Sequence, residues 1–196
     1  MRILAIADEA DKMLWDMLDR TLLEGVDLIL SAGDLPAEYL SFLTCFTHAP
    51  ILYVHGNHDT KYSVQPPEGC ICCEDDIIEV DGLRILGLGG SMRYREGPCM
   101  YSENEMRKRI RKLRFKLKKH NGFDILLAHA PLCGIGDKPD PAHLGFVCFK
   151  ELCDKFSPKA VVHGHIHKAY SFDFKRELSY NGVRIINASG RTFIDI

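Results

Sequence analysis

Five short apolar runs, each followed by a polar residue, constrain the fold of this chain most. They span residues 2–7, 27–32, 51–54, 124–128 and 160–162. Runs this short, rich in Ile, Leu and Val, are typical of strands buried on both faces. The pattern predicts further strands at residues 77–80, 83–88, 170–174 and 183–186, with Asp81-Gly82 and Asn181-Gly182 as hairpin turns.

Segments whose apolar residues recur at helical spacing lie between several of these runs. This spacing predicts helices over residues 11–24, with Asp11 as N-cap, and over 36–46 and 147–156. Strands that alternate with helices indicate an α/β layered fold with mixed sheets. No linker or repeat of fixed period divides the 196 residues, so we predict a single domain over 1–196.

Composition excludes some function classes. The formal charge of -2 gives no global bias toward nucleic acid or membrane. The first apolar run is too short for a signal peptide, and no run reaches the length that crosses a bilayer, so we expect a cytoplasmic protein without a membrane partner. The eight cysteines are then expected to be reduced thiols. Cys70, Cys72 and Cys73 lie close together, but without a CxxC pair they are interpreted as small side chains leading into a strand rather than as a metal or redox site.

Polar side chains that bind metals follow the five apolar runs. They are Asp8, Asp34, Asn57, His58, His129, His165 and His167. In α/β sheets, ligands bind outside the carboxyl ends of the strands, so these side chains are expected to meet at one edge. Carboxylate oxygen and neutral imidazole nitrogen suit Mn²⁺, Fe and Zn²⁺. One such residue is usually a cap or a satisfied polar group, but five coincidences at strand ends indicate a metal site.

The order of these motifs resembles that of the calcineurin-like metallophosphoesterases, in particular small phosphoesterases of the bacterial type. Gly33-Asp34, Gly56-Asn57-His58-Asp59, His129 and Gly164-His165-Ile166-His167 match four of the five family elements in order. The resemblance implies a layered αββα sandwich of two mixed β-sheets flanked by helices. It also implies a metal-dependent hydrolase that acts on a phosphodiester or a small phosphomonoester.

The resemblance further implies a dinuclear site with two divalent metal ions. Asp34 would bridge both ions, Asn57, His129 and His165 would complete one site, and Asp8 and His167 would serve the other. A metal-bound hydroxide would attack phosphorus. His58 would protonate the leaving oxygen, and Asp59 would orient His58. Mn²⁺ is the expected ion, with Fe, Zn²⁺ or Ni²⁺ as alternatives.

One position departs from the family pattern. The first element reads Asp8-Glu9-Ala10, where the family has a histidine in place of Ala10. Water, Glu9 or Asp11 would have to fill the gap, and we expect that site to bind its ion more weakly or to favour a hard ion such as Mn²⁺. The alternative is a binding scaffold that kept the fold and lost catalysis, as a retromer subunit of the same superfamily has done.

Three other segments are expected to border the site or the surface. Arg93, after Gly89-Gly90, is predicted to contact substrate phosphate, and the alternative is a surface charge without such a role. The Pro- and Gly-rich stretch 131–145 is expected to form a rim, with His143 exposed on it. Residues 103–119 hold nine Lys or Arg against two Glu on a helical pattern. We interpret them as a helix with a solvated basic face, and the alternative is a nucleic-acid-processing phosphodiesterase that uses this basic helix.

Overall fold

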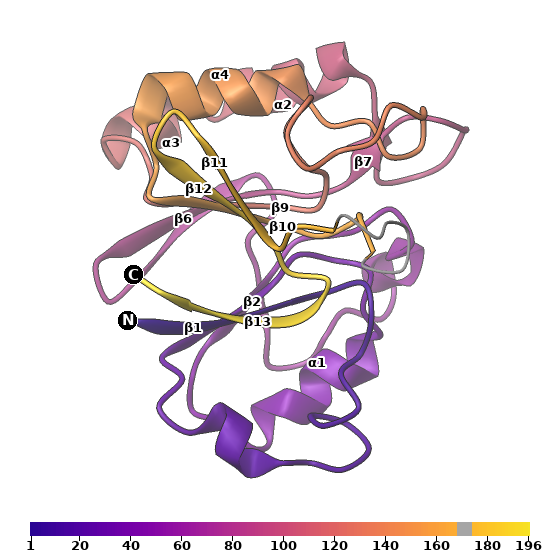
Figure 1. Cartoon of the computed structure of the whole chain (residues 1–196), viewed down its shortest axis with the longest axis vertical. Helices are drawn as coiled ribbons and strands as arrows, with labels where there is room; N and C mark the ends of the chain where they lie inside the picture. Colours follow the sequence, from indigo (N-terminus) through magenta and orange to yellow (C-terminus); the bar gives the residue numbers. More distant parts are fainter. Residues whose placement is uncertain (168–173) are drawn as a thin grey trace.

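Two large β-sheets lie face to face at the centre of the computed structural model, which describes residues 1–167 and 174–196 (Figure 1). The first sheet has the order β13-β1-β2-β3-β4 and contains β1 (Arg2–Ala7), β2 (Leu28–Ser31), β3 (Ile51–Tyr53), β4 (Ile71–Cys72) and β13 (Gly190–Asp195). The second has the order β11-β12-β10-β9-β6-β5 and contains β5 (Asp76–Val80), β6 (Leu83–Leu88), β9 (Ile125–Ala128), β10 (Ala160–His163), β11 (Glu177–Tyr180) and β12 (Val183–Asn187). Both sheets are mixed, since β13, β11 and β5 pair antiparallel and the other neighbours pair parallel.

Helices cover the outer face of each sheet. Helix α1 (Ala37–Thr44) lies on the first sheet, and α2 (Glu103–Lys112), α3 (Arg114–Lys119) and α4 (Val147–Phe156) lie on the second (Figure 1). Ser102 and Glu105 form a capping box, which satisfies backbone N–H groups at the start of α2. Two short 3-10 helices, η1 (Arg20–Leu23) and η2 (Thr60–Ser63), and a two-stranded pair, β7 (Ser91–Met92) and β8 (Met100–Tyr101), complete the elements. The predicted αββα sandwich is confirmed.

Alternation along the strands explains why the apolar runs are continuous. In β1, Ile3, Ala5 and Ala7 pack in the core between the sheets, whereas Leu4 and Ile6 pack in the core beneath α1. In β9, Ile125 and Leu127 face the core between the sheets, and Leu126 and Ala128 face the helices α2 to α4. Because both faces of each central strand are buried, no polar residue is tolerated until the strand ends.

The predicted helix over residues 11–24 is wrong. This segment forms turns followed by η1. Leu18 adopts a left-handed backbone conformation (φ 44°), and the Asp19 side chain accepts a hydrogen bond from the Thr21 N–H, which starts a new helical turn there. Trp15 stacks on Tyr39 of α1 at 4.9 Å between ring centroids, so tertiary packing overrides the helical spacing.

The C-terminal hairpin also differs in part from the sequence-based expectation. Strand β11 pairs with β12 across the predicted Asn181-Gly182 turn, and the sequence pattern did not indicate β11. The strand predicted at 170–174 lies outside the described residues, apart from Phe174, which is in no strand. Strand β13 was not predicted either, and it pairs with β1 so that the two chain ends lie side by side (Figure 1). In the described parts of the chain, no helix is long and apolar enough to cross a membrane.

Candidate metal centre

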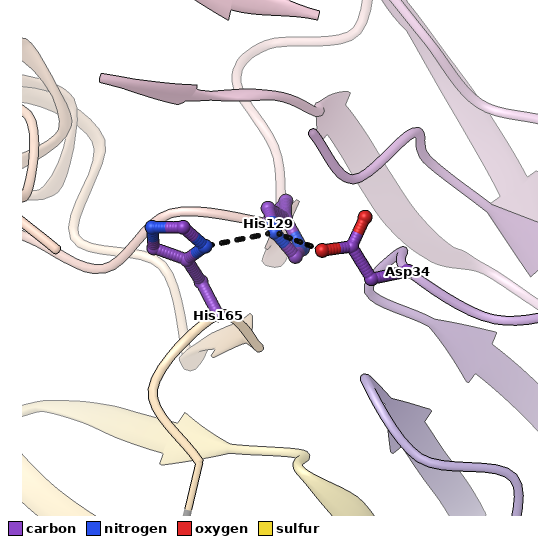
Figure 2. Close-up of side chains that lie close together, drawn as sticks. All are labelled: Asp34, His129 and His165. Atoms are coloured by element: carbon purple, nitrogen blue, oxygen red, sulfur yellow. Dashed lines mark hydrogen bonds and ion pairs between the residues drawn. The ribbon is translucent and has the colours of Figure 1, made fainter. Parts of the chain in front are cut away.

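The loops after β2, β3, β9 and β10 bring four predicted ligands together: Asp34, Asn57, His129 and His165. The Nε2 atom of His129 lies 3.0 Å from Asn57 Oδ1, 3.1 Å from His165 Nδ1 and 3.3 Å from Asp34 Oδ2. Figure 2 shows His129 between the other two titratable side chains. Asp34 and Asn57 come from the first sheet, and His129 and His165 from the second, so the centre joins the two sheets.

Backbone geometry holds these side chains in position. Asp8, Asp34 and His165 all have positive φ angles (66°, 57° and 68°), a conformation uncommon for residues other than glycine and often found at functional sites. The loops after β2 and β3 touch each other at Gly33 and Gly56. A Cβ atom on Gly33 would lie 2.3 Å from the Gly56 nitrogen, so this approach requires glycine.

Backbone carbonyls set the proton positions on both central histidines. His129 Nδ1 lies 2.7 Å from the Ala32 oxygen, and His165 Nε2 lies 2.6 Å from the Ala142 oxygen. A carbonyl only accepts hydrogen bonds, so each of these nitrogens carries a hydrogen. In the neutral state the other nitrogens, His129 Nε2 and His165 Nδ1, therefore present lone pairs to each other. Metal-binding histidines are usually oriented by such a contact on the second ring nitrogen.

The electrostatics of the centre favour a cation. Burial raises the pKa of Asp34, but His129 and the His58 N–H outweigh burial, so the net shift is downward. Burial lowers the pKa of His129, but Asp34 and Asp8 outweigh it and raise the pKa. Burial lowers the pKa of His165, and the neighbouring His129 lowers it further. A positive charge at His129 Nε2 would thus face three acceptors, Asn57 Oδ1, His165 Nδ1 and Asp34 Oδ2.

Asp8 lies next to this group and has an unused oxygen. Its Oδ1 accepts a hydrogen bond from the His165 N–H at 2.8 Å, whereas its Oδ2 is buried and has no hydrogen-bond partner among the residues that the structure describes. Burial raises the pKa of Asp8. A buried carboxylate oxygen without a partner is costly, and a bound cation would satisfy it. The donor set therefore fits a divalent ion.

The last predicted ligand, His167, lies beside Glu9. Its Nδ1 is 3.3 Å from Glu9 Oε1. The other candidate for the gap, Asp11, accepts hydrogen bonds from Arg191 and from the Met13 N–H. Ala10 packs against the core beneath α1. Of the two carboxylates beside Ala10, Glu9 is therefore the one that contacts a predicted ligand.

The two residues predicted to act in proton transfer, His58 and Asp59, lie in the loop after β3. His58 is exposed, and its N–H donates to Asp34 Oδ1 at 2.7 Å. Asp59 is buried, and its Oδ2 accepts the N–H groups of Asp34 and Gly56, both at 2.7 Å. Asp59 thus stabilises the two loop backbones, and its predicted role in orienting the His58 ring stays a prediction. Burial raises the pKa of Asp59 to about 6.

Arg93 lies on the predicted loop, but its guanidinium pairs with Glu105 at 2.9 Å and donates to the Met100 oxygen. Its assignment to substrate stays a prediction. The adjacent Tyr94 contacts the centre, since Asn57 Nδ2 lies 3.5 Å from the Tyr94 hydroxyl. The sequence did not single out Tyr94, although the Gly89-Gly90 motif pointed to its loop.

The rim segment 131–145 contacts the centre through the Ala142 carbonyl. The His143 ring, predicted to be exposed, is only partly exposed, and its centroid lies 5.4 Å from that of His165. Within the described residues, Asp34, His129 and His165 form the one group of three or more His, Cys, Asp or Glu whose ligand atoms lie within 4.8 Å of one another. Cys70, Cys72 and Cys73 form no such group.

A buried ion network supports the loop after β3. Glu74 accepts hydrogen bonds from the His55 and Gly89 N–H groups and pairs with His55 Nδ1 at 3.1 Å. Arg109 of α2 pairs with Glu74 and with Asp75, and donates to the Gly89 oxygen at 2.8 Å. The network links α2 to the loops that carry Asn57 and Tyr94. Sequence reasoning missed it, because its members lie on four separate segments.

Comparisons with known proteins agree with this geometry. An uncharacterised protein of Haemophilus influenzae is 25% identical over 178 residues, which cover 76% of this chain and 73% of that protein. The crystal structure of TT1561 of Thermus thermophilus has a TM-score of 0.68 at 16% identity and covers 96% of this chain and 89% of its own. GAP50, the anchor in the inner membrane complex of Plasmodium, has a TM-score of 0.59 at 12% identity. This match covers 96% of this chain and 71% of the GAP50 chain. These two structures show a shared fold.

The family itself is shown by a match to residues 1–169, which include every predicted metal ligand. Family and fold together support phosphoester hydrolysis at a metal site, and the family implies divalent metal ions. The chain belongs to the calcineurin-like phosphoesterase family.

Proposed function

We propose that this protein hydrolyses a phosphodiester or a small phosphomonoester with two divalent cations bound at the candidate metal centre. One observation carries the proposal: four atoms with free electron pairs converge on one point. When both histidines are neutral, none of these four atoms carries a hydrogen that could bond to the others. They are Asp34 Oδ2, Asn57 Oδ1, His129 Nε2 and His165 Nδ1. A proton on His129 can satisfy only part of this set, whereas a divalent cation can accept electron pairs from all four.

The residues divide into two sets of ligands. Asp34, Asn57, His129 and His165 would hold the first cation. Asp34, Asp8 and His167 would hold the second, and the unpartnered Asp8 Oδ2 supports this assignment. Glu9, beside His167, would take the place of the missing imidazole. Because oxygen ligands predominate in the second set, Mn²⁺ is the favoured ion, with Fe, Zn²⁺ or Ni²⁺ as alternatives.

The cations, when bound, neutralise charge on the phosphoryl oxygens and make hydroxide available near neutral pH. The side chains around them complete the chemistry. His58, exposed on the loop after β3, would give a proton to the leaving oxygen. The Tyr94 hydroxyl, beside Asn57, can donate a hydrogen bond to a substrate oxygen. Asp59 keeps the loops of Asp34 and Gly56 in register through two backbone hydrogen bonds.

The test combines metal binding with turnover. Protein stripped by chelation is titrated with Mn²⁺ in a calorimeter and is then assayed with bis(p-nitrophenyl) phosphate and p-nitrophenyl phosphate. We expect two binding events and hydrolysis that returns with the metal. Hydrolysis that persists in the stripped protein, or no heat of binding, would refute the proposal.

Ala10 favours a second candidate function, a metal-binding scaffold with weakened catalysis. The same experiment separates the two functions, because a scaffold would bind Mn²⁺ without hydrolysing either ester. The exposed His58 favours the enzyme, since a scaffold has no use for an acid beside the metal ligands.

A further inference from the structure

A groove of about 780 Å³ runs between α2, α3 and α4 on the outer face of the second sheet. These helices form the outermost layer of the molecule on that side (Figure 1). No residue of the candidate metal centre lines the groove. The groove is therefore a surface separate from the proposed catalytic site.

One wall of the groove carries a line of cations. Arg107, Arg111, Arg114 and Lys118 recur every three or four residues along α2 and α3, which places them on one helical face. Lys155 on α4 adds a fifth positive charge. The groove's acidic residue, Glu151, is engaged by Arg107 at 2.5 and 2.6 Å. Among the described residues, the other four cations have no carboxylate partner, so the groove keeps a positive surface.

The floor of the groove is apolar. Ile110, Leu117, Leu152 and Phe156 line it, and all four pack in the core beneath these helices. Ile110 and Phe156 are only partly buried, so hydrocarbon is open to a ligand. A phosphate backbone or a free anion would pair with the cations but would leave the apolar floor exposed to water. A ligand that uses both must be acidic on its flanks and apolar along one stripe.

We propose that this groove binds an acidic amphipathic helix of a partner protein. The cations recur about once per helical turn, a rise of ~5.4 Å. Glu or Asp residues four apart on an incoming helix have the same spacing, so an aligned helix can pair with several cations while its apolar stripe covers Ile110 and Phe156. An apolar helix face laid into a hydrophobic groove is a recurrent mode of peptide recognition.

The test uses a dye-labelled synthetic helix about five turns long, with Leu along one stripe and Glu on both flanks. Fluorescence anisotropy with the full-length protein measures its affinity. A scrambled peptide of the same composition is compared, together with a single-stranded oligonucleotide of equal charge. We expect the amphipathic peptide to bind at least about tenfold more tightly than either, because only it matches both floor and wall.

Charge reversal locates the binding. The double substitution Arg111→Glu with Lys118→Glu should lower the affinity for the amphipathic peptide at least about tenfold. The matched control, Lys108→Glu with Lys112→Glu, makes the same change in charge on α2 outside the groove and should have an effect of less than about threefold. Circular dichroism verifies that both variants fold. Equal losses in the two variants, equal binding of the scrambled peptide or tighter binding of the oligonucleotide would overturn the proposal, and the last result would make the groove a nucleic-acid surface.

Discussion

At the scale of single residues, Asp34 contributes most to the candidate metal centre. Its Oδ2 faces His129, its Oδ1 accepts the His58 N–H, and its own N–H is held by Asp59. Asp34→Asn keeps the shape of the side chain but removes the charge that two cations would share. We expect both cations to be lost and turnover to fall by more than about 100-fold, since residues that merely orient ligands already contribute 10–100-fold. Metal analysis and the diester assay measure this, with the exposed Asp16→Asn as control. Full metal content in Asp34→Asn would exclude the bridging role.

His58 is expected to act on the leaving group rather than on the metal. His58→Ala should lower kcat by about 10²–10⁴-fold for an ester with a poor leaving group, the usual contribution of a general acid. The metal content should not change. For p-nitrophenyl esters the loss should be smaller, because p-nitrophenolate leaves without a proton. The ratio of kcat values across a series of leaving groups measures the effect, and a ratio that stays constant would exclude proton donation by His58.

Glu9 and Asp11 flank Ala10, and the structure distinguishes between them. Glu9 contacts His167, whereas Asp11 is engaged by Arg191 at 2.6 Å. Glu9→Gln should lower the affinity for the second cation by about 10–100-fold and leave the affinity for the first cation unchanged. Asp11→Asn is the matched carboxylate control and should change neither affinity. Calorimetric titration with Mn²⁺ resolves the two sites. A larger effect of Asp11→Asn would assign the missing position to Asp11.

At the scale of elements, Glu74 connects α2 to the loop after β3. Although burial raises the pKa of Glu74, His55 and Arg109 lower it from 4.5 to about 2. The pKa of His55 is raised from 6.5, chiefly by its hydrogen bond to Glu74. The Glu74 contribution to stability is therefore complete above pH 4.5 and is lost as the pH falls to about 2. The His55 contribution is complete below pH 6.5 and is lost as the pH rises through the raised pKa.

Glu74→Gln should thus destabilise the fold most between about pH 4.5 and 6.5. It leaves Arg109 buried without its main partner, and breaking a buried pair in this way costs about 3–5 kcal/mol. Urea unfolding of wild type and variant across the pH range measures the difference. Glu79→Gln, on the exposed side of β5, is the control. A difference that does not vary with pH would mean that Glu74 is not ionised in the folded protein.

The sequence predicted some elements well and others poorly, for identifiable reasons. Strands β1, β2, β3, β9 and β10 were predictable because both of their faces are buried, which leaves uninterrupted apolar runs. Strand β13 was not, because most of its residues are only partly buried and its pairing with β1 joins opposite ends of the chain. The helix predicted at 11–24 failed because Trp15 packs on α1 and Leu18 takes a left-handed conformation.

The candidate site shows the same division. Ligands at strand ends were predictable, because parallel strands bring their carboxyl ends to one edge. Contacts through backbone atoms were not. Asp59 binds two N–H groups, and Ala142 contributes only its carbonyl, so neither role depends on a side-chain pattern that a sequence displays. Arg109 was hidden among nine basic residues, and only its burial against Glu74 distinguishes it.

At the scale of the whole molecule, the candidate metal centre is a junction between the two sheets. The first sheet supplies Asp8, Asp34 and Asn57, and the second supplies His129 and His165. The apolar core between the sheets also holds them together, as do hydrogen bonds such as the one that the His165 N–H donates to Asp8 Oδ1. A cation that binds ligands from both sheets binds the folded state and not the unfolded chain, so it must stabilise the fold.

Metal binding is therefore expected to raise the melting temperature. At a free concentration of about 100 times Kd, one site adds about 2.7 kcal/mol to the free energy of unfolding. For a chain of this length that corresponds to roughly 5–10 °C. Calorimetric melting of the stripped protein with increasing Mn²⁺ measures the shift, and NaCl at equal ionic strength controls for salt. His129→Gln should reduce the shift, because it removes the nitrogen on which the ligands of the first cation converge. A shift of equal size in His129→Gln would mean that Mn²⁺ stabilises the protein from another site, and the junction between the sheets would then have to be assigned to the apolar core alone.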